Sequence, residues 1–389
     1  MRFAILGVDA ETIELAHAAR HRGHALVAGC EVSPAVADDW AALAPAARRT
    51  DDWEAALDGQ DDIDAAIIGR GANDETRADQ LRLLMQAAMP LIVVHPIHPS
   101  MLVYYELDMI RREAAPVIVP YAPQHWHPAV QRLAELTHGP ADQGWGGASQ
   151  IAIERSLADR SRACVLDQYV RDMELFRGLA QEVSKVGAMS STPSDFSNLS
   201  VQMSGSTSAL VRWSVVPAGA SSGARLVVAA MGGNSATLVA PDGDEPWTLE
   251  LRQQGKTTTE TFADWDGPLA AIERFEAAMT GGPIEPDWTA ASQDLELADA
   301  VERSLRRGRT VELHYEDHTE EASFKGIMAA GGCGLLLLAL LLVVAATTAA
   351  HFGLPLAQFW PVGLLLVLGA FLAMQFLTLA FPRNPSPPA

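Results

Sequence analysis

Three charged residues near the middle of the chain have the spacing of a single helical face. Asp167, Arg171 and Glu174 fall at positions i, i+4 and i+7, and residues three or four apart on a helix are neighbours. We predict that Arg171 bridges the two carboxylates, which stabilises a helix by about a few tenths of a kcal/mol for each exposed pair. The alternative is that Arg171 anchors an anionic ligand, since arginine stays protonated and cannot serve as a general base.

The histidines of the chain suggest proton transfer more readily than metal binding. His95 precedes Pro96 at the end of an apolar run, and an imidazole there could act as a general acid or base at neutral pH. The alternative is a structural histidine held in front of a proline turn. His125 and His127 would share one side of an extended segment, but no Asp, Glu or Cys follows at a metal-binding spacing. No metal is therefore expected.

The first apolar run, from Phe3 to Gly7, leads into a turn that decides whether a dinucleotide can bind. Such turns follow a G-x-G-x-x-G pattern, so that the backbone can approach a pyrophosphate at a helix N-terminus. Here the three glycine positions are Gly7, Asp9 and Thr12. Asp9 and Glu11 place carboxylates where the anion should lie, and Asp9 can cap the helix amides itself. At about 4 Å and an effective dielectric constant of about 20, one unit charge repels the anion by about 4 kcal/mol, an upper figure for an exposed turn.

Other residues that could contact a nucleotide stand where predicted strands end. Glu31 follows Gly7 by 24 residues, about where an acid that binds a ribose would be. Arg70 could contact a phosphate, and an ordinary surface-loop arginine is the alternative. The remaining candidates for cofactor binding are Gly69, Asn73 and Pro96.

The elements that must position these residues follow two patterns. In residues 1–122 short apolar runs alternate with helical stretches, which is typical of a Rossmann-like α/β domain with a parallel sheet covered on both faces. In residues 123–315 alternating strands predominate, which predicts an α+β domain with an open, mostly antiparallel sheet and helices on one face. Ligands of doubly wound folds bind beyond the carboxyl ends of the strands, where the candidate residues of the first domain stand.

Three segments resemble the Gfo/Idh/MocA family of NAD(P)-dependent oxidoreductases. They are Gln124-His-Trp-His-Pro128 after the last predicted Rossmann strand, the helix motif from Asp167 to Leu179, and the closing helix and strand from Leu295 to Leu313. The resemblance extends over about residues 1–315. It implies NAD or NADP as cofactor and a sugar-like or other polyol substrate. It also raises the expectation of a homo-oligomer formed through the exposed face of the second sheet.

Two positions depart from the family pattern where the resemblance places proton transfer. The family's lysine before a proline is His95 here, and its catalytic histidine is Arg171. Losing groups that act together should remove most of a rate advantage, so we predict impaired or lost catalysis and a cleft that still binds a ligand or partner. One alternative is an active oxidoreductase in which His95 replaces the lysine and Tyr169 or Asp167 assists. The other is a non-catalytic nicotinamide-nucleotide sensor.

A stretch without charge follows the body of the chain. No Asp, Glu, Lys or Arg occurs between Lys325 and Arg383. A bilayer core about 30 Å thick needs about 20 apolar residues in a helix, so we predict a linker at 316–326, a transmembrane hairpin at 327–381 with spans at about 327–350 and 358–381, and a tail at 382–389. The alternative is a buried helix pair in a soluble protein. Basic residues before and after the hairpin predict that body and tail face the cytoplasm.

The charge balance restricts the partners. The formal net charge of the chain is −20, and residues 326–389 contribute only Arg383, so the rest carries −21. Such a body has no electrostatic footprint for nucleic acid and is repelled by anionic headgroups. The expected partners are therefore a lipid bilayer, contacted through the two C-terminal helices, and a small molecule.

Overall fold

The computed structural model describes residues 1–57, 63–71, 73–138, 145–179, 183–205, 209–219, 222–230, 232–243 and 245–313, together with Leu340, Leu341, Val343 and Val344. The chain divides into two compact units, Met1–Leu313 and His314–Ala389. In the second unit the four described residues are helical, and the predicted linker, hairpin and tail otherwise lie outside the described residues. Among the residues that are described, no helix combines the length and the apolar character that crossing a membrane requires.

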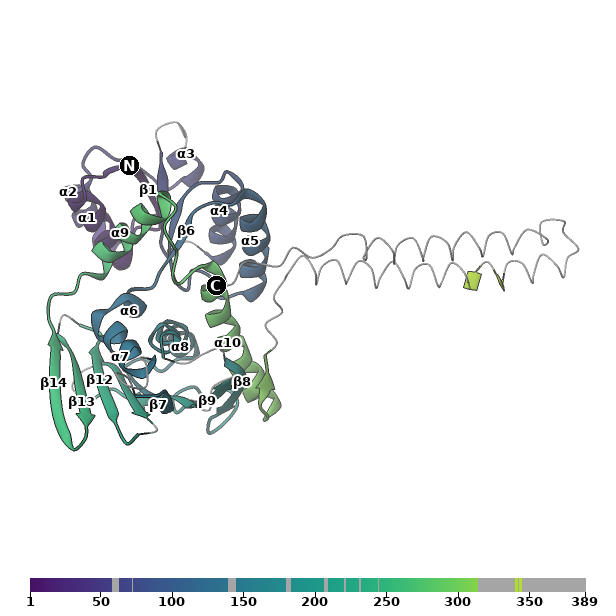
Figure 1. Ribbon diagram of the computed structural model, residues 1–389. Helices are drawn as coiled ribbons and strands as arrows, with labels where there is room; N and C mark the ends of the chain where they lie inside the picture. The colour runs from purple at the N-terminus through teal and green to yellow at the C-terminus, as the bar shows by residue number, and fades with distance from the viewer. Residues whose placement is uncertain are drawn as a thin grey trace, which may run out of the picture. The chain divides into compact units, whose positions relative to one another are not determined.

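The first sheet of the body has six parallel strands among the described residues (Figure 1). In chain order they are β1 (Arg2–Leu6), β2 (Ala25–Cys30), β3 (Arg48–Thr50), β4 (Ala65–Ile68), β5 (Leu91–Val94) and β6 (Ile118–Tyr121). Their spatial order is β3-β2-β1-β4-β5-β6, so the direction of winding reverses between β1 and β4. β1, β4, β5 and β6 are buried nearly throughout, as strands covered on both faces are. The predicted Rossmann-like sheet is confirmed, and its ligand edge lies where β1 and β4 end.

Helices flank this sheet on both sides (Figure 1). They are α1 (Ala10–His21), the 3-10 helix η1 (Pro34–Val36), α2 (Ala37–Leu43), α3 (Trp53–Leu57), α4 (Asp74–Gln86) and α5 (Met101–Ala114). α4 and α5 pack against each other, and the loops that precede them bring the ends of β4 and β5 to the ligand edge.

The second sheet is larger and mixed. Its described strands are β7 (Ala148–Leu157), β8 (Val183–Met189), β9 (Ser200–Gly205), β10 (Leu210–Pro217), β11 (Gly223–Ala230), β12 (Ser235–Pro241), β13 (Trp247–Gln253), β14 (Lys256–Phe262) and β15 (Val311–Glu312). β7 and β10 are parallel, and the other pairings described are antiparallel. The helices α6 (Pro123–Trp126), α7 (Pro128–His138) and α8 (Arg162–Arg177) lie between this sheet and the first one (Figure 1). The predicted open, mostly antiparallel sheet with helices on one face is confirmed.

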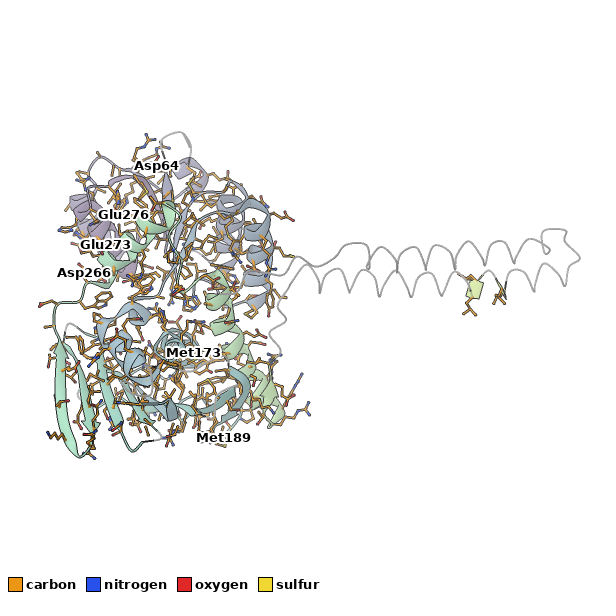
Figure 2. All side chains as sticks on the ribbon, viewed as in Figure 1. Asp64, Met173, Met189, Asp266, Glu273 and Glu276 are labelled. Carbon is orange, nitrogen blue, oxygen red and sulfur yellow. The ribbon has the colours of Figure 1, made fainter. Side chains whose placement is uncertain are left out.

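Two late helices return to the first sheet. α9 (Gly267–Met279) packs against α1, and α10 (Trp288–Arg307) packs against α5, α8 and β8. Glu273 and Glu276 stand on α9 beside the first sheet (Figure 2), and the guanidinium of Arg22 pairs with them at 3.3 and 2.6 Å. Phe275 of the same helix lies 5.7 Å from Phe3 between ring centroids. α9 thereby packs against β1 and α1 at the start of the chain.

α8 begins at Arg162 and ends at Arg177. Ser161 has an extended backbone and accepts a hydrogen bond from the amide of Cys164, so the helix begins after Ser161, and Gly178 caps its end.

Candidate functional site

The carboxylate of Asp9 accepts hydrogen bonds from the backbone amides that follow β1. It caps α1, and its Oδ1 accepts hydrogen bonds from the amides of Glu11 at 3.0 Å and Thr12 at 2.9 Å. Its Oδ2 accepts a third hydrogen bond from the amide of Arg70 at 3.1 Å. A pyrophosphate at this helix N-terminus would need such free amides. The residues of this turn therefore do not fit a dinucleotide in the described conformation.

Gly7 and Gly69 serve a backbone contact between this turn and the loop after β4. Gly7 has a φ of +77°, in a region that glycine adopts without steric cost. A Cβ atom on Gly7 would lie 2.5 Å from Nη2 of Arg77 and 2.7 Å from the carbonyl oxygen of Arg70. A Cβ atom on Gly69 would collide with the carbonyl oxygen of Gly7 and the methyl group of Thr12. The glycines are required because the two loops touch.

Glu31, the candidate ribose-binding acid, is held by α4. Its Oε2 accepts a hydrogen bond from Nη2 of Arg77 at 2.8 Å, and its Oε1 accepts one from Nε2 of Gln80 at 2.8 Å. The Arg77 side chain is 2% exposed. A buried arginine requires a charged partner, so the carboxylate of Glu31 stabilises the fold here.

Four charged residues, which we call the interdomain clasp, join the two domains in front of the turn. They are Glu11 of α1, Arg70 after β4, and Asp167 and Arg171 of α8. Arg171 donates two hydrogen bonds to the carboxylate of Glu11 at 2.6 and 2.8 Å, and its Nε lies 3.2 Å from Asp167. Nη1 of Arg70 reaches Asp167 at 3.0 Å. Burial raises the pKa of Glu11, but the hydrogen bond and charge of Arg171 outweigh burial and hold that pKa below its ordinary value.

The expected bridge from Arg171 to both carboxylates of α8 is correct for Asp167 and wrong for Glu174. Glu174 is 2% exposed and accepts a hydrogen bond from the amide of Gln124 at 3.0 Å, so it caps the short helix α6. Burial raises its pKa to about 8, the charge of Asp294 adds to this, and Arg171 opposes it. The bidentate partner of Arg171 is instead Glu11, which belongs to the other domain.

His95 lies inside the protein, away from solvent. It is 4% exposed, its Nδ1 is 3.3 Å from the hydroxyl of Tyr104, and its Nε2 is 3.8 Å from Asp294. Burial, followed by the charge of Arg177, lowers its pKa to about 3. The imidazole is therefore neutral at pH 7 and has almost no protonated form with which to act as a general acid.

Two other candidates from the sequence also have structural roles. Tyr169 is fully buried; its hydroxyl contacts the sulfur of Met203 at 3.1 Å, and its ring packs edge-on against Trp213. It faces the second sheet and not the cleft. Asn73 caps α4 by accepting a hydrogen bond from the amide of Thr76 at 2.9 Å.

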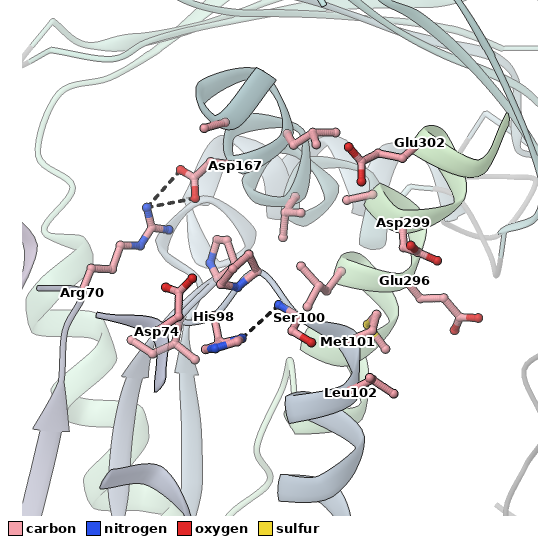
Figure 3. Close-up of a pocket in the computed structure, with 18 of the residues that line it drawn as sticks. Arg70, Asp74, His98, Ser100, Met101, Leu102, Asp167, Glu296, Asp299 and Glu302 are labelled. Atoms are coloured by element: carbon pink, nitrogen blue, oxygen red, sulfur yellow. Dashed lines mark hydrogen bonds and ion pairs between the residues drawn. The ribbon is translucent and has the colours of Figure 1, made fainter. Parts of the chain in front are cut away.

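Two cavities flank α8. The larger, which we call the α5–α10 cavity, has a volume of about 890 Å³ and lies between the loops after β4 and β5 and the helices α5, α8 and α10 (Figure 3). Pro96, Arg70 and Asp167 line it, so three of the predicted site residues meet there. The smaller, which we call the α8–β13 cavity, has a volume of about 420 Å³ and is lined by polar residues such as Gln124, Gln168 and Arg171 and by the ring of Trp247.

The segment around His125 is helical and not extended, which was the condition for His125 and His127 to share one side. α6 includes His125, while the ring of His127 stacks on Trp247 with centroids 3.8 Å apart. The two histidines therefore do not form the pair of side chains on one side that an extended segment would present.

No protein-family model matches the sequence, and no curated protein matches it either. Solved structures do match. A myo-inositol dehydrogenase from Corynebacterium glutamicum is 18% identical, with a TM-score of 0.62, and the match covers 81% of this chain and 99% of that one. An oxidoreductase from Agrobacterium radiobacter, solved in complex with NAD+, L-tartaric acid and magnesium, is 14% identical, with a TM-score of 0.65 and coverage of 80% and 98%. A UDP-N-acetylglucosamine 3-dehydrogenase from Acidithiobacillus ferrooxidans is 18% identical, with a TM-score of 0.63 and coverage of 79% and 98%.

These matches are to Gfo/Idh/MocA-type oxidoreductases and cover about four fifths of the chain. The resemblance predicted from the sequence is confirmed as a shared fold. Activity, cofactor and substrate have to be argued from the site itself, because a fold supports many functions.

Proposed function

We propose that this protein is an oxidoreductase homologue that no longer binds a nicotinamide nucleotide, and that the cleft between its domains binds a ligand or a partner. The observation that carries this proposal is the carboxylate of Asp9, which accepts three backbone hydrogen bonds at the end of β1. A pyrophosphate would have to displace this carboxylate and lie beside Glu11, which the interdomain clasp holds in front of the turn.

The proton-transfer positions support the same proposal. Arg171 is engaged by two carboxylates, and His95 is buried and neutral at pH 7. Neither side chain is placed to give or take a proton in an open cleft. Loss of the cofactor turn and of both proton-transfer groups together should leave little of the ancestral rate advantage.

Titration of the full chain, in a nonionic detergent, with NADH and NADPH tests this proposal. We expect no calorimetric or fluorescence signal up to millimolar nucleotide. The variant Asp9→Gly combined with Glu11→Ala empties the amides and removes the second carboxylate, so it should bind nucleotide more tightly than the parent chain. Asp38→Asn, which changes an exposed acid in the first turn of α2, is the matched control. Micromolar binding by the parent chain would contradict the proposal, and such binding without turnover would favour a nucleotide sensor.

An active oxidoreductase on a sugar-like or polyol substrate is the second candidate. The polar lining of the α8–β13 cavity favours it, as do the inositol and amino-sugar compounds in the names of the similar proteins. The test is NAD(P)-linked oxidation of myo-inositol and of common aldoses by the full chain. Turnover that His95→Ala abolishes would support this candidate and overturn the loss of catalysis.

Attachment to a bilayer is a separate part of the proposal. It is supported by the uncharged stretch between Lys325 and Arg383, which is long enough for two spans. The body and the tail would both be cytoplasmic. A reporter fused after Ala389 should then behave as cytoplasmic, and a signal from the opposite side of the membrane would refute the hairpin.

A further inference from the structure

The α5–α10 cavity has an apolar floor. Ile97, Leu166, Val170 and Leu295 line it, together with the ring of Tyr105, which is 45% exposed. A volume of about 890 Å³ is in the range of natural small-molecule sites. Such sites combine an apolar body with a few polar groups that fix the orientation and charge of the ligand. The charged residues of the lining therefore indicate which class of ligand fits.

Each arginine of the lining already has a carboxylate partner. These pairs largely neutralise the positive charge of the cavity within the protein itself, although Nε and Nη2 of Arg70 have no hydrogen-bond partner among the described residues. The pairs are Arg70 with Asp167 at 3.0 Å, Arg77 with Glu31 at 2.8 Å, Arg162 with Glu302 at 2.5 Å and Arg303 with Asp299 at 2.9 Å.

Two carboxylates of the lining remain without a cation at ion-pair distance among the described residues. One is Asp74, in the first turn of α4, where the helix dipole stabilises a negative charge. Its neighbour His98 is a weak counter-charge, because burial lowers the pKa of that imidazole even though the charge of Asp74 opposes this. Asp74 and His98 stand on the same side of the cavity (Figure 3).

The other carboxylate is Glu296 of α10. The neutral side chain of Tyr105 and the charge of Arg303 both act on it. Arg303 is itself paired with Asp299. The lining of the cavity thus has surplus negative charge next to an apolar floor and an exposed aromatic ring, and residues 1–325 together carry −21.

We propose that the α5–α10 cavity binds a small organic ammonium ion with an apolar body. The ammonium group would lie against Asp74 or Glu296, and the body would cover the apolar floor and the face of Tyr105, which attracts cations. This assignment rests on the proposed function, since it names the ligand class of the retained cleft. The two fail separately, because the nucleotide titration decides the loss of the cofactor and the experiment below contains no nucleotide.

Calorimetric titration of the full chain in nonionic detergent, at pH 7, with three probes of the same aryl body tests the charge. The probes are 2-phenylethylamine, 2-phenylethanol and 3-phenylpropionate, which are positive, neutral and negative. We expect the amine to bind at least about fivefold more tightly than the alcohol, and the carboxylate to bind most weakly. Equal binding of amine and alcohol, tighter binding of the carboxylate, or no binding by the amine would overturn the proposal.

Variants locate the site. Asp74→Asn and Glu296→Gln each remove one negative charge from the lining and should weaken amine binding about two- to fivefold, the range of a solvent-exposed ion pair. Asp38→Asn removes an acid from a comparable helix position outside the cavity and should change nothing. Ala163→Trp places a large ring in the cavity mouth and should abolish binding. Amine binding that survives Asp74→Asn and Ala163→Trp would place the ligand elsewhere and refute the assignment, even where Glu296→Gln fails to fold.

Discussion

We predict that this protein loses stability at alkaline pH because Glu174 ionises. Replacement of Glu174 by glutamine should remove most of that loss. Glu174 of α8 is 2% exposed. Its carboxyl group accepts a hydrogen bond of 3.0 Å from the backbone amide of Gln124 in the short helix α6. Burial is the main reason that its pKa is raised, from an ordinary value of 4.5 to about 8. Glutamine keeps the shape and one acceptor oxygen but never carries a charge.

The sign of the pH effect on stability follows from the direction in which folding shifts the pKa of Glu174. In the folded protein the group binds a proton up to about pH 8, whereas in the unfolded chain it loses the proton near pH 4.5. Its stabilising contribution is therefore complete below pH 4.5 and disappears as the pH rises through about 8. The full difference corresponds to about 5 kcal/mol, and the part between pH 6.5 and 8 to about 2 kcal/mol. The buried His95 contributes a smaller change of the opposite sign at the low end of this window, because the unfolded chain still binds part of a proton there near pH 6.5 while the folded protein does not.

The assay is urea unfolding of the full chain in detergent, followed by tryptophan fluorescence, between pH 6.5 and 8.5. Relative to Glu174→Gln, the free energy of unfolding of the parent protein should fall by about 2 kcal/mol over this window. Glu113→Gln, an exposed residue of α5, should keep the slope of the parent. Parallel profiles of the parent and Glu174→Gln would show that Glu174 is ionised in the folded state and would refute the reasoning.

Three further substitutions probe the packing of the site and its supports. Gly69→Ala adds a methyl group that meets Thr12 and the Gly7 carbonyl; it should cost about 1–3 kcal/mol of stability, and an unchanged urea midpoint would speak against the loop contact. Asp172→Asn removes the buried one of the two carboxylates that pair with Arg155, the other being the partly exposed Asp242, and should cost up to about 3–5 kcal/mol in the same assay; a change within about 0.5 kcal/mol would show that the pair is not buried. Arg171→Met should raise the pKa of Glu11, since burial then acts without its counter-charge; NMR titration of isotope-labelled glutamate measures this, and an unshifted pKa would mean that the clasp does not form in solution.

The fold could be predicted where an element's own residues determine it. The apolar runs of β1, β4 and β5 are short, continuous and buried throughout or nearly so, which only a sheet covered on both faces explains. The exposed elements were not predicted. β3 and most of β14 face solvent, so neither carries the alternation of apolar and polar residues on which strand prediction depends.

The site could be predicted only as far as its contacts are local. The Asp9 cap depends on residues within one helical turn, and the sequence indicates it. The bidentate partner of Arg171, by contrast, lies 160 residues away in another domain, whereas helical spacing points to Glu174, three residues away. Arg77 was missed for the same reason. A lone arginine within a polar helix shows no sign that it will be buried against Glu31.

The departures from the family pattern are coupled to each other in the structure. Asp9 stands where a glycine would be, and its carboxylate is satisfied by the amides that a cofactor would need. Arg171 stands where the resemblance places a histidine, and its charge is satisfied by Glu11, the second acid of the same turn. A histidine at position 171 would leave Glu11 partly buried without its bidentate partner, and a glycine at position 9 would leave three amides open beside that acid. Changing either residue alone to the family's residue would therefore leave polar groups without partners and lower the stability of the fold. This mutual satisfaction of Asp9, Glu11 and Arg171 supports the proposal that the cleft has a use other than nucleotide-dependent chemistry.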